Sequence, residues 1–314
     1  MLDDNVKIQK MVEIAKMYYE ENLTQNDIAK RLGVSRPLVS KMLADAREAG
    51  IVTIQIKSPF VSNEFLMEEI KKIYNIDGGM VIPQSDTDYL TDQVILNNII
   101  SYINNDLKKY KKFGLGWGKI ISDLVQKLEI SEKKIELEGY VCPLVGNISM
   151  PTKDFHSNEL IRMFSQMTFL KPYYLFAPAF LATEQEKNLF MNIENYKDIK
   201  RLWEKLDVAI LSIGNHPSVP DLATASRFGN NLQKEKAIGN ILSYYYDING
   251  KFITGDNDFS IEIPLTDLRK VEHVIGICSS KTSKEAIIGA LKTKIITHLI
   301  IDVFLLVYCF NLCL

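Results

Sequence analysis

Apolar residues recur at intervals of three and four positions in three successive segments near the start of the chain. This spacing places them on one face of an α-helix and leaves polar residues on the other face. The sequence therefore predicts amphipathic helices over residues 7–20, 25–32 and 36–49. The expected buried faces are Ile8, Met11, Val12, Ile14, Ala15 and Tyr18 in the first helix and Leu38, Val39, Met42, Leu43 and Ala46 in the third.

Capping residues separate these three helices. Thr24 is an expected N-cap, because its hydroxyl can accept the amide of Asp27, whose carboxylate can reach back in a short variant of the capping box. Gly33 is expected to end the second helix in the left-handed conformation. Ser35 then caps the third helix, and Pro37 lies in its first turn, where a missing amide costs nothing.

A short strand is predicted after the third helix. Gly50 ends that helix, and the β-branched run over residues 51–56 is typical of one strand of a small wing. Helix, helix, short turn, helix and strand in this order form a winged helix-turn-helix. Residues 28–57 contain six basic and two acidic side chains, a local charge of +4 in a chain whose net charge is −2. This local basic surface favours nucleic acid as the partner, with a protein-binding trihelical module as the alternative.

The third helix is expected to enter a DNA major groove with its N-terminal residues against the base edges. Ser35 and Arg36 lie at that end, and Arg36 is the candidate for a bidentate contact with guanine. Because one such unit offers few phosphate contacts, a homodimer or homotetramer is expected. Gln25, Ser40, Lys41 and Arg47 are candidates for contacts with backbone phosphates, and Pro37 completes the predicted DNA-binding face.

The remainder of the chain alternates between apolar β-type runs and helical patterns, which predicts an α/β fold with a doubly wound parallel sheet. Such sheets bind ligands beyond the carboxyl ends of their strands. The predicted organisation is a winged helix-turn-helix domain over residues 1–57, a linker helix within 58–78 and a ligand-binding domain over 79–314. The expected strands are residues 80–82, 113–115, 135–144, 173–176, 208–213, 273–277 and 295–301, and the expected helices are 63–74, 89–109, 119–128, 154–167 and 284–291.

Glycine-containing turns follow several of these runs, at residues 114–118, 145–147, 212–215 and 238–240. The first of them precedes a helix, whose N-terminus could hold a phosphate group. It lacks the glycine spacing of a dinucleotide-binding fold and the lysine of a nucleotide-binding loop. A turn that only packs a helix against a strand is an equally good interpretation.

Composition limits the remaining possibilities. Hydrophobic residues make up 46% and charged residues 24% of the 314 residues, as in ordinary soluble globular proteins. The four cysteines and four histidines lack the spacing of metal ligands, so no metal site is expected, and a reducing cytoplasm is the expected compartment. Residues 295–314 are long enough to span a bilayer, but His298 and Asp302 would be costly there. A buried strand followed by a final helix is therefore expected, and no membrane partner.

Several longer segments occur in a characteristic order. The first is KMYYEENLTQNDIAKRLGVSRPLVSKMLADAREAGIVTIQI, and the later ones are GLGWG, CPLVGN, LFAPAF, LDVAILSIG, AIGNILSYYYDINGK and EAIIGAL. In this order they resemble the SorC/DeoR-type sugar-responsive bacterial transcriptional regulators, along nearly the whole chain. The end of the chain departs from the family, because VFLLVYCFNLCL replaces its polar-faced helix.

The resemblance implies a repressor of a carbohydrate catabolic operon, without enzymatic activity and without a cofactor. Its second domain would have the fold of phosphosugar isomerases and sugar-phosphate deaminases, and a phosphorylated sugar bound there would change the affinity for operator DNA. Family members are typically dimers or tetramers. The effector-binding residues implied by the resemblance are Gly114, Gly116, Trp117, Gly118, Gly146, Asn147, Gly214, Asn240, Asp247 and Lys281.

The implied anion site departs from the family pattern. Ile120 stands where members carry threonine, Asn240 where they carry aspartate, and Ser283 where they carry lysine. Arg227 is a candidate to supply the missing positive charge. Val145 stands where some members hold a lysine able to form an imine, so covalent capture of a sugar is not expected.

Two other functions remain open on these residues. The first is a sugar-phosphate isomerase or deaminase with a DNA-binding appendage, which needs a general acid and base, and only Asp247 is a carboxylate near the expected site. The second is a regulator that binds its operator but has lost its effector site.

Overall fold

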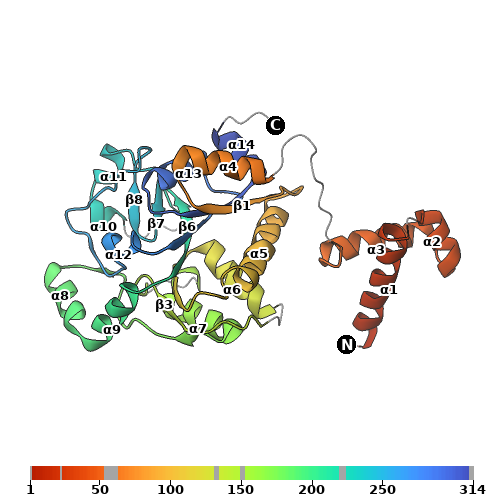
Figure 1. Ribbon diagram of the computed structural model, residues 1–314, viewed down its shortest axis with the longest axis horizontal. Helices are drawn as coiled ribbons and strands as arrows, with labels where there is room; N and C mark the ends of the chain where they lie inside the picture. The colour runs from red at the N-terminus through yellow and green to blue at the C-terminus, as the bar shows by residue number, and fades with distance from the viewer. Residues whose placement is uncertain are drawn as a thin grey trace. The chain divides into compact units, whose positions relative to one another are not determined.

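The computed structural model describes residues 2–21, 23–52, 63–130, 134–148, 153–218 and 224–310. The chain divides into two compact units, Met1–Ser58 and Pro59–Leu314 (Figure 1). Each unit has a hydrophobic core of its own. Most of the predicted wing strand over residues 51–56 lies outside the described residues.

The first unit consists of three helices, α1 (Leu2–Tyr19), α2 (Gln25–Leu32) and α3 (Arg36–Glu48). Their core contains Ile14, Ile28, Val39 and Leu43, each at most 3% exposed. The bounds predicted for α2 are confirmed, whereas α1 begins five residues before its expected start. Leu38 was expected in the buried face but is 40% exposed, because the face that meets the core follows Val39 and its neighbours at helical spacing.

The predicted caps fix the turns between these helices. The Thr24 hydroxyl accepts the Asp27 amide at 3.3 Å and donates to the Asp27 carboxylate at 2.6 Å. Gly33 has φ of +66° at the end of α2, a conformation that glycine adopts without strain. Ser35 occupies the N-cap position of α3, but its hydroxyl makes no capping hydrogen bond. That hydroxyl, on an exposed residue, is therefore available to another partner.

The second unit is built on a sheet in which seven of the described strands are parallel neighbours, which confirms the predicted fold class. In spatial order they are β1 (Gly78–Ile82), β11 (His298–Asp302), β10 (His273–Ile277), β6 (Val208–Asn215), β2 (Lys112–Leu115), β3 (Tyr140–Pro143) and β4 (Lys171–Pro172). After β2 the chain proceeds toward β4, and after β6 it proceeds toward β11. The direction thus reverses between β2 and β6, and ligands bind at such switch points.

Helices cover both faces of this sheet (Figure 1), with α5, α6 and α7 on one face and α4, α13 and α14 on the other. Their bounds are α4 Asn63–Tyr74, α5 Asp88–Asn105, α6 Lys119–Ile130, α7 Ser157–Thr168, α8 Glu184–Asn192, α9 Glu194–Trp203, α10 Thr224–Phe228, α11 Asn231–Lys234, α12 Leu265–Leu268, α13 Lys284–Lys292 and α14 Val303–Phe310, with a 3-10 turn at Lys153–Phe155. The helix predicted as a linker, α4, packs on β1 and buries Leu66, Met67 and Ile70 in the core of the second unit.

A hairpin that the sequence did not predict extends the sheet. Strands β7 (Gly239–Ile241) and β8 (Tyr244–Tyr246) are antiparallel, and β7 pairs with the end of β6. Residues 238–240, expected as a turn, are therefore mostly strand. A second small sheet joins β5 (Phe180–Leu181) to β9 (Phe259–Ser260). The turn of the β7–β8 hairpin packs on Gly116, at the switch point between β2 and β6.

The apolar C-terminal segment forms a buried strand followed by a helix, β11 and α14, as its composition predicted. Leu306 and Cys309 of α14 are buried against the core. Within the described part of the chain, no helix is both long enough and apolar enough to cross a membrane.

Candidate functional site

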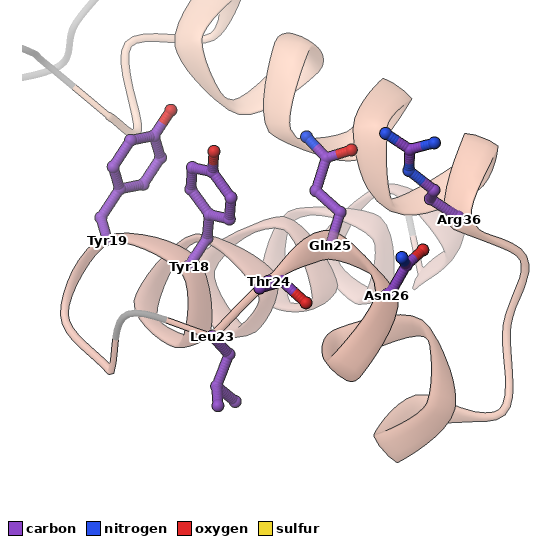
Figure 2. Close-up of a pocket in the computed structure, with 7 residues that line it drawn as sticks. All are labelled: Tyr18, Tyr19, Leu23, Thr24, Gln25, Asn26 and Arg36. Atoms are coloured by element: carbon purple, nitrogen blue, oxygen red, sulfur yellow. The ribbon is translucent and has the colours of Figure 1, made fainter.

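The first unit carries an open groove of about 580 Å³ where the end of α1 meets the beginnings of α2 and α3 (Figure 2). It is lined by Tyr18, Tyr19, Leu23, Thr24, Gln25, Asn26 and Arg36. The Thr24 cap fixes the first turn of α2, and thereby positions Gln25 and Asn26 at the rim. Arg36 reaches the groove from the first turn of α3. Two of the residues predicted to contact DNA, Gln25 and Arg36, thus lie at one site.

The other residues of the predicted DNA-binding face are exposed along α3: Ser35, Pro37, Ser40, Lys41 and Arg47. Within the described residues, neither Arg36 nor Lys41 forms a salt bridge, whereas Arg31 is paired with Glu21 at 3.1 Å. Arg36 and Lys41 can therefore meet an anionic partner without first breaking an ion pair. The structure brings together the side chains that helical spacing had placed on one outer face.

In the second unit, the first glycine turn is closed by internal hydrogen bonds. The amide of Gly116 donates to the Ile210 carbonyl at 2.9 Å, and the amide of Gly118 donates to the Asp154 carbonyl at 2.8 Å. These two amides are thus engaged within the protein and do not form an open phosphate cradle. Gly118 has φ of +111°, which explains glycine at that position.

Trp117 lies in the core and not on the surface of this turn. Its side chain is 2% exposed and packs edge-on against Phe155 and Phe180, while its indole N–H donates to the Leu242 carbonyl. This burial fits a packing side chain better than the effector-binding role that the resemblance implied. Gly114 is equally confined, because a Cβ there would lie 2.4 Å from the Leu144 side chain.

The second glycine turn also has structural partners. The Asn147 side-chain amide donates to the Leu175 carbonyl at 2.9 Å, and its oxygen accepts the Asn158 amide at 3.1 Å. A Cβ at Gly146 would lie 2.6 Å from the backbone of Pro178. These contacts tie the end of β3 to the segment before β5.

Gly214 and Asn240 face each other across β6 and β7. A Cβ at Gly214 would lie 2.1 Å from the Asn240 side-chain oxygen, so only glycine fits opposite this asparagine. The Asn240 amide donates to the Leu242 carbonyl at 2.9 Å. Its buried oxygen has no hydrogen-bond partner among the described residues, and the residue is 8% exposed.

Asp247 and Lys281 have structural partners other than Gly214 and Asn240. One Asp247 carboxylate oxygen accepts the amides of Asn249 and Lys251, each at 2.9 Å, and so closes the turn after β8. Lys281 is exposed, and its carbonyl accepts the side-chain amide of Asn215 at 2.9 Å. The same Asn215 side chain accepts the Ser283 amide at 2.8 Å, which joins the end of β6 to the start of α13.

A buried polar cluster at the switch point was only partly anticipated by the sequence. Arg227 of α10 is 3% exposed and donates to the Asp258 carboxylate at 2.9 and 2.7 Å. It also donates to the Ser243 hydroxyl at 3.1 Å, and that hydroxyl donates to Glu262 in turn. These residues come from three separate segments, around residues 227, 243 and 258–262, so no sequence motif joins them.

The cluster lies directly beside the first glycine turn. The Phe180 ring packs against Trp117 on one side and lies 4.0 Å from the Arg227 guanidinium on the other. The second terminal nitrogen of Arg227, Nη1, is buried and has no hydrogen-bond partner among the described residues. An unpaired donor on Arg227 and an unpaired acceptor on Asn240 thus flank the turn at residues 242–243.

Glu262 is the acidic member of the cluster. It is 5% exposed, and its carboxylate accepts the Ser243 amide at 3.0 Å as well as the Ser243 hydroxyl. Burial raises its pKa from the ordinary 4.5 to about 7, although the Arg227 charge and the Ser243 hydrogen bonds act in the opposite direction. Among the described residues, no three His, Cys, Asp or Glu side chains gather as metal ligands would.

Comparison with known proteins decides the family. A family model described as a sugar-binding domain matches residues 58–304, and one described as winged helix-turn-helix DNA-binding matches residues 17–53. The chain belongs to this family of sugar-binding regulators. The resemblance to SorC/DeoR-type transcriptional regulators is thereby confirmed, and the first unit is a winged helix-turn-helix DNA-binding domain.

Curated relatives span nearly the whole of this regulator. The sorbitol operon regulator of Klebsiella pneumoniae is 27% identical over 311 residues, covering 95% of this chain and 96% of the relative. The deoxyribonucleoside regulator of Bacillus subtilis (strain 168) is 28% identical over 308 residues, covering 95% and 96%. Both names are those of transcriptional regulators.

Solved structures agree in fold. The full-length sorbitol operon regulator SorC from Klebsiella pneumoniae superposes with a TM-score of 0.72 at 26% identity, covering 95% of this chain and 98% of that one. A DeoR family transcriptional regulator from Listeria monocytogenes gives 0.69 at 18% identity, covering 79% and 99%, and supports the fold alone.

Proposed function

We propose that this regulator represses a carbohydrate catabolic operon in the cytoplasm and is released from its operator by a phosphorylated sugar. The observation that carries the proposal is the pair of sites in one chain. An exposed basic helix face lies in the DNA-binding unit, and buried unpaired polar groups lie at the switch point of the sugar-binding unit. The sorbitol operon and deoxyribonucleoside regulators, whose names refer to a sugar alcohol and to a nucleoside that contains a sugar, support the same class of effector.

On the DNA side, Arg36 reads a guanine and the remaining residues of the face contact the backbone. Arg36 lies at the N-terminus of α3, where a recognition helix meets base edges. Gln25, Ser40, Lys41 and Arg47 bind phosphates, and Ser35 contributes its uncapped hydroxyl. Two or four copies of the chain assemble on the operator, because a single unit has too few phosphate contacts for tight binding.

On the effector side, we place the anionic group of the sugar at Arg227 and a sugar hydroxyl at Asn240. The free Nη1 of Arg227 donates to the anion, and the Asn240 oxygen accepts from a hydroxyl. The amides of Gly116 and Gly118 are engaged internally, and Ile120 has no donor, so the guanidinium takes over their role in binding the anion. Lys281, exposed on the neighbouring loop, is a second candidate for a phosphate contact.

Regulation then follows from thermodynamic linkage. If the effector and the operator favour different arrangements of the DNA-binding units, each must weaken the binding of the other by the same factor. No chemical step is required, and the chain has no catalytic role in this proposal.

A second candidate, a sugar-phosphate isomerase, is favoured by one observation. A carboxyl with a pKa of about 7, like that of Glu262, is matched to general acid–base catalysis at neutral pH. Both Glu262 oxygens already accept hydrogen bonds from Ser243, which leaves the group less able to reach a substrate. Proton exchange into a sugar phosphate in D2O, followed by NMR, separates the two functions, because a regulator leaves the sugar unlabelled.

The proposal is tested by capturing upstream DNA fragments from the source genome on the full-length chain. The captured duplex is then titrated with phosphates of fructose, deoxyribose and sorbitol. The proposal expects one fragment to be captured and one phosphorylated sugar to release it. Capture without release by any sugar phosphate would favour a degenerate effector site, and failure to capture any fragment would contradict the regulatory function itself.

A further inference from the structure

The groove of the first unit contains two residues that no DNA-binding assignment above includes, Tyr18 and Tyr19. Both lie at the end of α1, outside the two helices that define the DNA-binding face. Tyr18 is half-buried and packs on the core, and Tyr19 is 36% exposed. Their rings meet edge-on with centroids 4.9 Å apart, which holds each in position. Figure 2 shows both hydroxyls pointing to the same side as the Gln25 side chain.

The chemistry of the groove suits a phosphate. Its described lining residues contribute two phenol hydroxyls, two side-chain amides and one guanidinium, all of which can donate hydrogen bonds. None of these residues carries a carboxylate. Of the acids near the groove, Glu21 pairs with Arg31, Asp27 accepts a hydrogen bond from the Thr24 hydroxyl, and Glu20 is exposed to solvent. The lining residues themselves therefore offer an anion hydrogen-bond donors and one positive charge, from Arg36.

The position of the groove favours a phosphate of DNA over a free anion. The groove adjoins the first turn of α3, the helix end that meets base edges in this class of domain. A phosphate on the flank of the contacted base would lie against the start of α2, where the exposed Asn26 and the half-buried Gln25 stand. A free sugar phosphate would find no enclosed cavity there, because the groove is open along one side.

We propose that this groove binds one phosphate of the operator backbone and that the hydroxyls of Tyr18 and Tyr19 donate to it together with the Gln25 amide. The inference rests on the proposed function. It extends the DNA footprint beyond α2 and α3 to the end of α1. It also assigns a binding role to two side chains that helical periodicity had placed in, or next to, the buried face.

The proposal predicts a distinctive salt dependence. A tyrosine hydroxyl is neutral, so removing it weakens binding without changing the number of counterions released. Removing Lys41 should lower the salt slope by about one, whereas removing both hydroxyls should leave the slope unchanged. A hydrogen bond to a charged group is worth about ten- to a hundredfold in affinity, and this loss should be equal on operator and random DNA.

The test uses the full-length chain with Tyr18→Phe, Tyr19→Phe and the double variant. Phenylalanine keeps the ring and its packing, so the fold is preserved, and circular dichroism checks this. The matched control is Tyr89→Phe, because Tyr89 is 69% exposed on α5 of the other unit. Fluorescence anisotropy is measured on operator and scrambled duplexes over a series of salt concentrations. The double variant should bind both duplexes at least tenfold more weakly with an unchanged slope, and the control should bind as the parent does.

A second measurement locates the phosphate itself. Uncharged methylphosphonates replace the operator phosphates one at a time, and the effect of each is measured on the parent and on the double variant. If the tyrosines bind a phosphate, one replacement that weakens the parent should have a much smaller effect on the double variant. Fully additive losses at every phosphate, or unchanged affinity of the double variant, would overturn the proposal. If the parent binds no duplex at all, the proposed function fails as well, which distinguishes the two failures.

Discussion

Two residues of α3 are expected to contact different parts of the DNA, Arg36 a base and Lys41 a backbone phosphate. Arg36 stands at the helix N-terminus and has no salt bridge within the described residues, so its guanidinium can contact a guanine edge. Lys41 lies further along the exposed face and provides a point charge for a phosphate. The two substitutions should therefore have different consequences.

Arg36→Ala should relax base preference at one operator position and cost about 1–3 kcal/mol on the specific site. Lys41→Ala should weaken operator and random DNA alike and reduce the salt slope by about one. Binding to a library of single-base operator variants measures both effects. Equal losses on specific and random DNA for Arg36→Ala would contradict its role in base contact.

Arg227 is the residue on which the effector site depends. Arg227→Lys keeps the positive charge but loses the planar fork that holds Asp258 and Ser243 while presenting Nη1. We expect at least about tenfold weaker binding of the sugar phosphate, with operator affinity unchanged when no effector is present. Isothermal titration measures the effector, and Arg201→Lys, on the exposed surface of α9, is the control. Unaltered effector affinity would move the anion site away from Arg227.

Glu262 should make stability depend on pH. Its pKa in the folded chain is about 7 and its ordinary value is 4.5, so the folded state holds the proton more tightly than the unfolded state. The free energy of unfolding contributed by Glu262 therefore falls as pH rises through this interval, by up to about 3 kcal/mol. Burial lowers the pKa of His298 to about 4, which gives the opposite slope between pH 4 and 6.5.

The two contributions are separated by Glu262→Gln. The stability of this variant relative to the parent should improve steadily from pH 4.5 to 7, because only the parent loses stability from an ionising Glu262. Urea unfolding followed by tryptophan fluorescence reports on the second unit alone, since both tryptophans, Trp117 and Trp203, lie there. A stability difference that does not change with pH would contradict the assignment.

At the scale of elements, the caps of the first unit predict two contrasting substitutions. Thr24→Ala removes the cap of an eight-residue helix and should cost about 1 kcal/mol of local stability. Ser35→Ala removes a hydroxyl that caps nothing, so it should leave stability nearly unchanged and weaken DNA binding instead. Hydrogen exchange of the α2 and α3 amides in the full chain measures the first effect, and anisotropy the second. Faster amide hydrogen exchange in Ser35→Ala than in Thr24→Ala would contradict the conclusion that Thr24, and not Ser35, caps its helix with a side-chain hydrogen bond.

Some helices were predicted to the residue because their ends carry chemical signals, whereas α8 to α12 were not predicted. The bounds of α2 and α4 follow from local residues and are confirmed. The predicted strand over residues 135–144 reduces to Tyr140–Pro143, because the amides of Ile135 and Leu137 donate to carbonyls at the end of α7 and not to a neighbouring strand. Whether these amides bond to a neighbouring strand or to α7 depends on tertiary packing, which a run of hydrophobic residues alone does not determine.

At the scale of the whole molecule, the two candidate sites differ in how far the sequence could predict them. The DNA-binding face could be predicted because its residues lie close together in sequence and share one helical face. The effector cluster could not be predicted, because its residues come from α10, the turn of the β7–β8 hairpin and the two sides of β9, and meet only in the fold: Arg227, Ser243, Asp258 and Glu262. Several glycines that suggested a phosphate cradle are explained instead by close packing, as Gly214 against Asn240 illustrates.

The whole account depends on coupling between the two units. If a phosphorylated sugar releases the operator, then the operator must weaken sugar binding by an equal factor, whatever the arrangement of the units in the assembly. A coupling of about 1–3 kcal/mol, or a change of roughly 5- to 150-fold in affinity, is typical of allosteric proteins.

The most direct test is to measure operator affinity at zero and saturating concentrations of each sugar phosphate, alongside the matching unphosphorylated sugar, and then sugar affinity with and without operator. The account predicts that one phosphorylated sugar weakens operator binding at least about fivefold, that its unphosphorylated form does not, and that the reciprocal factor is the same. Operator affinity that no phosphorylated sugar changes would contradict it.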